Sequence, residues 1–199
     1  MIEAVFHANV QPTWNDTDMK LEKLRALAPA DQQIFLLGRI ALETSRLDAS
    51  LRFVHAALSG QNNVDAFLDA PDNFSVNVKK CRQLIDTHLT LNDQAGAAVL
   101  DAVVAARNVY QRRNRYTHDF LRKDLLNQGW ELARLSRQCA DAPEVMAVSF
   151  DDMVNLVTDL IAATWRLRGC AIYVLTGGWA GTAFGTVEGQ WDGSATLTR

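Results

Sequence analysis

The sequence contains few of the residues that cross-link or interrupt a chain. Of its 199 residues, only four are proline and three are cysteine. Cys81, Cys139 and Cys170 lie far apart and form no Cys-x-x-Cys pair, so neither a disulfide framework nor a zinc knuckle is indicated. The four histidines show no His-x-x-x-His spacing. We therefore expect a protein of a reducing compartment, with no metal site and no cofactor.

Other function classes are excluded by patterns that do not occur. The sequence contains neither the Gly-x-x-x-x-Gly-Lys-Ser/Thr string of a P-loop nor the Gly-x-Ser-x-Gly string of an α/β-hydrolase. It has no apolar run of 18 residues and does not begin with the charged and apolar regions of a signal peptide. The formal net charge of −3 gives no overall attraction to nucleic acid or membrane. We expect a cytoplasmic protein that does not bind membranes.

The positive signal in the sequence is helical periodicity. Hydrophobic residues make up 48% of the chain, which is enough for one sizeable core. Apolar residues recur at steps of three and four over four long stretches, and Gly60 ends the first of them. The predicted long helices are 30–59, 74–90, 93–117 and 150–176, with short helical pieces near 16–28 and within 61–72. The predicted core stripe of the first long helix is Ile34, Leu37, Ala41, Leu47, Leu51, Val54 and Leu58.

Two further helix starts and two non-helical regions complete the predicted organisation. Asn92 is a plausible N-cap, and Ser149 with Asp152 forms a capping-box pattern. Alternation over 130–135 and an apolar run over 145–148 predict a small hairpin. We predict an all-α fold: an antiparallel bundle of four main helices with a β-hairpin-like insertion and a glycine-rich C-terminal tail. The expected divisions are an N-terminal segment 1–29, the bundle 30–176 and the tail 177–199.

The predicted helix 93–117 changes character along its length. One face contains, in order, Leu100, Val103, Arg107, Tyr110, Asn114 and then His118. A stripe that begins as core and ends polar is typical of a functional site, because burying such groups costs free energy unless they are paired. Residues 107–123 also contain six basic residues and one acidic residue, which suits an anionic ligand such as a phosphodiester. The alternative is a solvated helix end whose positive charges complement the helix dipole.

The string Arg113-Asn114-Arg115-Tyr116-Thr117-His118 resembles the Arg-Asn-x-x-x-His motif of HEPN domains. RNA-cleaving members of that family carry the motif near the end of a long helix in a four-helix bundle. The form with Asn directly after Arg is expected by chance about 0.02 times in a chain of this composition. The looser Arg…His spacing also fits Arg82 and His88, which therefore serve as a decoy pair. The resemblance covers roughly residues 30–175, and Asp48 matches the acidic residue that faces the motif.

The resemblance implies a metal-independent endoribonuclease that cleaves RNA through its 2′-OH, of the kind used as a toxin or phage-defence effector. It also implies a homodimer whose two motifs line one cleft, with RNA as substrate and a cognate antitoxin as a further partner. His118 would act as general acid or base and Arg113 would hold the phosphate, while Asn114 would fix the imidazole tautomer. The residues expected to contact RNA are Arg107, Arg112, Arg115 and Tyr116.

Two other functions remain open at the level of sequence. The chain could be a non-catalytic HEPN-like module that binds RNA, a nucleotide or a partner protein. It could also be a structural helical dimer in which the motif is fortuitous. An intact motif favours the nuclease over the non-catalytic module.

Overall fold

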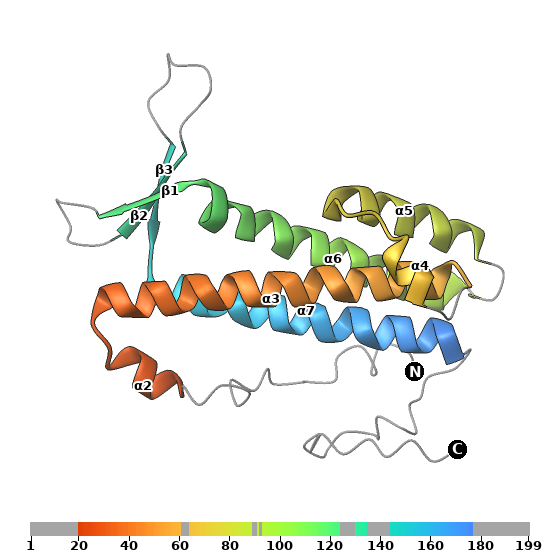
Figure 1. Ribbon diagram of the computed structural model, residues 1–199, viewed down its shortest axis with the longest axis horizontal. Helices are drawn as coiled ribbons and strands as arrows, with labels where there is room; N and C mark the ends of the chain where they lie inside the picture. Colours follow the sequence, from red (N-terminus) through yellow and green to blue (C-terminus); the bar gives the residue numbers. More distant parts are fainter. Residues whose placement is uncertain are drawn as a thin grey trace. The chain divides into compact units, whose positions relative to one another are not determined.

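The computed structural model describes residues 20–60, 64–88, 91, 93–123, 130–134 and 144–176. This part of the chain is an all-α helical bundle with one small antiparallel sheet (Figure 1). The helices are α2 (Leu21–Arg25), α3 (Pro29–Leu58), α4 (Val64–Leu68), α5 (Phe74–Thr87), α6 (Asp93–His118) and α7 (Phe150–Thr176). The strands are β1 (Phe120–Lys123), β2 (Trp130–Arg134) and β3 (Glu144–Val148).

The four long helices predicted from periodicity are confirmed as α3, α5, α6 and α7. The short helical piece expected within 61–72 is α4. The helix expected near 16–28 is shorter among the described residues, where only α2 forms. The proposed N-cap Asn92 and the glycine-rich tail 177–199 lie outside the described residues.

Local side chains explain where several helices begin and end. Ser149 and Asp152 form the predicted capping box: the Asp152 amide donates to Ser149 Oγ, and the Ser149 amide donates to Asp152 Oδ2, both at 3.0 Å. Asn73 caps α5 by accepting from the amides of Ser75 and Val76. Gly60 follows α3 with a φ of 68°, the left-handed conformation that favours glycine.

The described chain folds as two compact units that share the long helices. Unit 1 contains Ser50–Val104 and α7 from Trp165 onward. Unit 2 contains α2, the part of α3 up to Ala49, and Ala105–Thr164, which includes the sheet. Within unit 2, α6 runs antiparallel to α3 and α7 (Figure 1). The candidate motif therefore lies entirely within unit 2.

The sheet of unit 2 has one strand more than the sequence predicts. The expected pairing of 130–135 with 145–148 is confirmed as that of β2 with β3, in which Trp130 lies opposite Val148 and Arg134 opposite Glu144. Strand β1 was not anticipated; it pairs with the other edge of β2, so the strand order is β1-β2-β3. Four residues directly after a helix carry too little alternation to predict a strand. Pairing with β2 supplies the backbone partners that make these residues extended.

The predicted core stripe of α3 is right in its second half and wrong in its first. Leu47, Leu51, Val54 and Leu58 are buried, but Ile34 is 70% exposed. Ala41 is also exposed, and Leu37 is only half-buried. The buried face of the first half mixes polar with apolar side chains. The spacing of hydrophobic residues alone therefore does not reveal which face is buried. Its buried members are Gln33, Leu36, Arg39, Ile40, Glu43 and Thr44.

Candidate functional site

The last two turns of α6 carry the candidate site, and burial decreases along them. Ala106 is fully buried, whereas Arg107 in the next position is exposed. Arg113 and Asn114 are half-buried, and His118, the last residue of the helix, is exposed. The polar residues of this face therefore lie at the surface rather than in the core. Their desolvation cost is small, and a ligand can reach them.

Arg113 is held in place by uncharged groups. Its Nε donates to Thr44 Oγ1 of α3 at 3.2 Å, and its Nη1 donates to Asn114 Oδ1 at 2.8 Å. Nη1 also lies 3.4 Å from Thr117 Oγ1, and the guanidinium carbon lies 4.6 Å from the centre of the Tyr110 ring. Among the described residues no carboxylate pairs with Arg113. The guanidinium is thus fixed in position, and no described carboxylate neutralises its charge.

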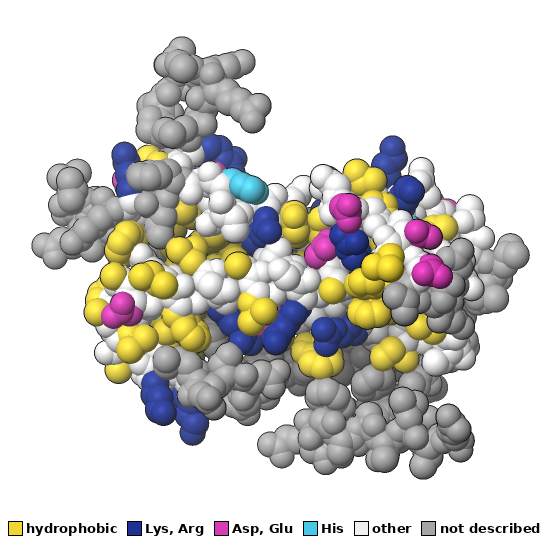
Figure 2. All heavy atoms as spheres, in the orientation of Figure 1, with side chains coloured by type: hydrophobic (Ala, Val, Ile, Leu, Met, Phe, Trp, Pro, Cys, Tyr) yellow, Lys and Arg dark blue, Asp and Glu magenta, His cyan; other side chains and the backbone are white. Residues whose placement is uncertain are grey.

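Two other arginines of the segment 107–123 pair with acidic residues outside that segment. Arg112 Nη1 donates to Asp159 Oδ2 of α7 at 2.5 Å. Arg122 of β1 hydrogen-bonds Glu131, which lies directly opposite on β2. The local excess of positive charge over residues 107–123 is therefore reduced in the folded protein. On the face seen in Figure 2, Lys and Arg side chains are interspersed with hydrophobic ones instead of forming one basic stripe.

Arg115 belongs to a network that joins α6 to the sheet. Its Nε donates to Asp119 Oδ2 at 2.9 Å, and Arg134 Nε of β2 donates to Asp119 Oδ1 at 3.2 Å. The Asp119 side chain is 5% exposed. Burial acts to raise the pKa of Asp119, but the hydrogen bonds from Arg115 and Arg134 outweigh it and hold that pKa below its usual value. This network orients the end of α6, where the motif lies.

The remaining motif residues make fewer hydrogen bonds with one another than the family resemblance implies. Asn114 and His118 are four residues apart and share a face of α6. The Asn114 carbonyl oxygen, however, accepts from Arg113, and no described residue hydrogen-bonds the His118 imidazole. Tyr116 is half-buried, and burial raises the pKa of its hydroxyl. Arg107 is exposed and makes no ion pair with another described residue.

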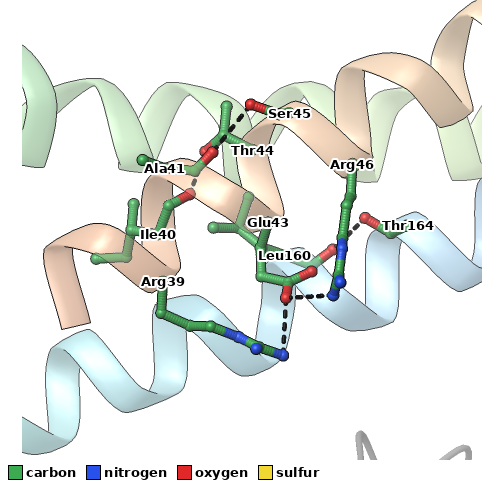
Figure 3. A network of polar contacts seen from close by, with 9 residues as sticks. All are labelled: Arg39, Ile40, Ala41, Glu43, Thr44, Ser45, Arg46, Leu160 and Thr164. Atoms are coloured by element: carbon green, nitrogen blue, oxygen red, sulfur yellow. Dashed lines mark hydrogen bonds and ion pairs between the residues drawn. The ribbon is translucent and has the colours of Figure 1, made fainter. Parts of the chain in front are cut away.

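Helix α3 contains a buried carboxylate, that of Glu43, which the sequence did not single out. Asp48, the predicted acidic residue, is half-buried and lies one turn beyond Thr44 on α3. Glu43 is more deeply buried, and its Oε1 accepts from Arg39 at 2.8 Å and from Arg46 at 2.9 Å. Figure 3 shows this triad on the side of α3 that faces α7. Glu43 neutralises arginines of its own helix, so its role is structural.

Three residues to which the sequence assigns no role also belong to this site: Thr44, Thr117, and Tyr110 of the polar face of α6. Each contacts the Arg113 side chain. Tyr110 and Thr117 lie three and four residues from Arg113, so helical spacing could have indicated them. Thr44 lies 69 positions away in the sequence and is brought to Arg113 only by the packing of α3 against α6.

The described residues also bear on metal, redox and membrane chemistry. No cluster of three His, Cys, Asp or Glu side chains there could hold a metal ion. Cys81 and Cys170 are free, and burial raises the pKa of each thiol to about 12. None of the described helices combines the length and the apolar character needed to cross a bilayer. No family model, curated protein or solved structure matches the chain.

Proposed function

We propose that the protein is a metal-independent endoribonuclease of the HEPN type, with Arg113 and His118 acting on an RNA phosphodiester. The observation that carries the proposal is the environment of Arg113. Its neighbours Arg112 and Arg115 are each neutralised by a carboxylate, whereas Arg113 is oriented by hydroxyl, amide and aromatic groups. An arginine that is fixed but not neutralised is suited to binding an anion.

The geometry supports an anion site next to His118. The guanidinium of Arg113 lies over the Tyr110 ring and hydrogen-bonds Asn114 and Thr117, which lie nearer the end of the helix. Asn114 shares a helix face with His118, and its hydrogen bond from Arg113 links the guanidinium to that face, which supports a phosphate site used by both residues. Nη2 of Arg113 makes no hydrogen bond to a described residue and remains available to a phosphate oxygen.

The chemistry needs one proton acceptor and one proton donor. A histidine removes the proton of the 2′-OH, and the 2′-oxygen attacks phosphorus while the bond to the 5′-oxygen breaks. A second group protonates that 5′-oxygen, which leaves a 2′,3′-cyclic phosphate on one product. Each chain contributes one His118, so the proposal includes a homodimer in which two copies supply both groups. Arg113 stabilises the charge that develops on the phosphate.

One observation favours a second function, a HEPN-like module that binds RNA without cleaving it. No described residue orients the His118 imidazole, and the Asn114 oxygen that would do so accepts from Arg113 instead. A histidine without an orienting partner is a weaker general base. Arg113 would serve equally well in binding alone. A toxin or defence role with a cognate antitoxin belongs to the nuclease proposal.

The experiment is an RNA cleavage assay with purified full-length protein in the presence of EDTA. We expect products with 2′,3′-cyclic phosphate ends and no cleavage of DNA, which lacks the 2′-OH. His118→Ala should lower the rate by roughly 10²–10⁴-fold, and Arg113→Lys by about 10²-fold through loss of the planar donor fork. The decoy variants Arg82→Ala and His88→Ala should retain full activity. Far-UV circular dichroism checks that each variant is folded.

The same assay separates the two functions. RNA binding that weakens with added salt, without any cleavage, would replace the nuclease by the binding module. Undiminished cleavage by His118→Ala, or cleavage abolished by EDTA, would refute the proposed mechanism. Light scattering that shows a monomer at micromolar concentration would also refute it, because one chain supplies only one His118.

A further inference from the structure

Unit 1 contains a cavity that the proposed nuclease does not use. Its volume is about 310 Å³, within the range of small-molecule sites. It lies between α3 and α5, and all of its lining residues belong to unit 1. Five of the six are polar or basic and none is acidic: His55, Ser59, Lys80, Gln83, Leu84 and Thr87.

The imidazole of His55 is the first indication that the cavity receives a ligand. Its Nδ1 is buried and makes no hydrogen bond. Buried polar atoms without a partner are uncommon in proteins, and because this nitrogen has almost no accessible surface, a ligand in the cavity would meet the remaining edge of the ring. Burial, and after it the positive charge of Lys80, lowers the pKa of His55 below 6.5. An anion bound beside both side chains would offset this repulsion.

The hydrogen-bonding capacity of the lining residues narrows the class of ligand. Lys80 and Gln83 are exposed at the cavity, and neither side chain bonds to another described residue. They can therefore donate to a ligand. Ser59 and Thr87 donate their hydroxyl hydrogens to backbone carbonyls, at 2.8 Å for Ser59 and 3.2 Å for Thr87. These two hydroxyls are left as acceptors, which suits a ligand that carries hydroxyl groups of its own.

We propose that this cavity binds a small phosphate monoester that bears hydroxyl groups, with Lys80, Gln83 and His55 around the phosphate. Lysine is a common phosphate ligand because its ammonium group acts as a point charge, and no carboxylate of the lining competes for it. Ser59 and Thr87 accept from the hydroxyl groups of the ligand. Leu84 supplies the single apolar wall. The site is separate from Arg113 and His118, which belong to unit 2.

The test is a titration of the full-length protein with glycerol phosphate and with inorganic phosphate, at constant ionic strength. The NMR signal of the His55 imidazole, assigned with His55→Gln, reports on binding. We expect a saturable shift of this signal, a rise in the His55 pKa, and tighter binding of glycerol phosphate than of inorganic phosphate. Lys80→Met should weaken binding about tenfold or more, the cost of one hydrogen bond to a charged group.

Lys79→Met is the matched control, because Lys79 is an exposed neighbour on α5 that does not line the cavity. It should bind as the wild type does, and Arg113→Lys should also leave this titration unchanged. Equal losses in Lys79→Met and Lys80→Met, no saturation up to tens of millimolar, or equal binding of acetate would overturn the proposal. Loss of RNA cleavage with intact phosphate binding would refute only the nuclease, so the two proposals fail independently.

Discussion

The buried triad of Arg39, Glu43 and Arg46 allows the sharpest test of the fold. We consider Glu43→Gln, which keeps the shape and the acceptor oxygen of the side chain but removes its charge. The side chains of Arg39 and Glu43 are 5% and 2% exposed, while that of Arg46 is 40% exposed. The variant would therefore leave one buried arginine without a counter-charge, and one arginine that water can reach (Figure 3).

The magnitude follows from burial and distance. At 2.8 Å and an effective dielectric constant of about 20, each ion pair is worth about 6 kcal/mol of gross attraction. Desolvation of each buried ion costs several kcal/mol, so the intact pair contributes little net stability. Removing one partner leaves the desolvation cost without the attraction, and the expected loss is about 3–5 kcal/mol. Arg46→Met should cost about 1 kcal/mol or less, because solvent already screens that arginine.

The assay is urea unfolding followed by circular dichroism, with the midpoint and the m-value compared between variants. For a chain of this size the loss from Glu43→Gln corresponds to roughly 6–20 °C in Tm. The double variant Arg39→Met, Glu43→Leu should be within about 1 kcal/mol of the wild type or more stable, because the buried Arg39 Nε has no hydrogen bond to lose. A loss below about 1 kcal/mol for Glu43→Gln, with an unchanged m-value, would refute the buried placement of the triad.

Further predictions concern the ends of α6 and α7. Ser149→Ala should cost about 0.5–2 kcal/mol in the same unfolding assay, because the capping box at the start of α7 is lost; Ser149→Asp, which can still cap, should recover most of it. Because the pKa of Asp119 is lowered in the folded state, its contribution is present above the unfolded value of about 3.9 and is lost as pH falls through the folded value. Unfolding measured from pH 6 to pH 2 should therefore show a shallower acid decline in Asp119→Asn; an identical decline would contradict the role of Arg115 and Arg134.

The helices could be predicted because their determinants are local. Three- and four-residue spacing of apolar side chains located α3, α5, α6 and α7, and Ser149 with Asp152 marked the start of α7. Strand β1 could not be predicted, because it exists through pairing with β2 and not through its own alternation. The first half of α3 was misassigned for a related reason: Glu43 and Arg39 are buried together, and only their mutual pairing makes such burial tolerable.

The candidate site also combines features that the sequence predicts with features that only the fold decides. The motif of Arg113, Asn114 and His118 is a property of the sequence, and helical spacing places Asn114 and His118 on one face of α6. The tertiary structure decided which of the adjacent arginines, Arg112 or Arg113, pairs with a carboxylate and which can still bind an anion. Arg112 meets Asp159 of α7, whereas Arg113 meets the Thr44 hydroxyl of α3.

The sequence by itself determined the helical class, the helix ends and the order of side chains along α6, because these depend on residues within a few positions of one another. Only the tertiary structure decided that Arg112 meets a carboxylate while Arg113 meets a hydroxyl, and which polar atoms are buried. Asp159 and Thr44 lie 47 and 69 positions from the arginines they contact, and His55 meets the α5 residues of its cavity only through helix packing. Such pairings depend on the packing of distant segments, which spacing along the chain does not encode.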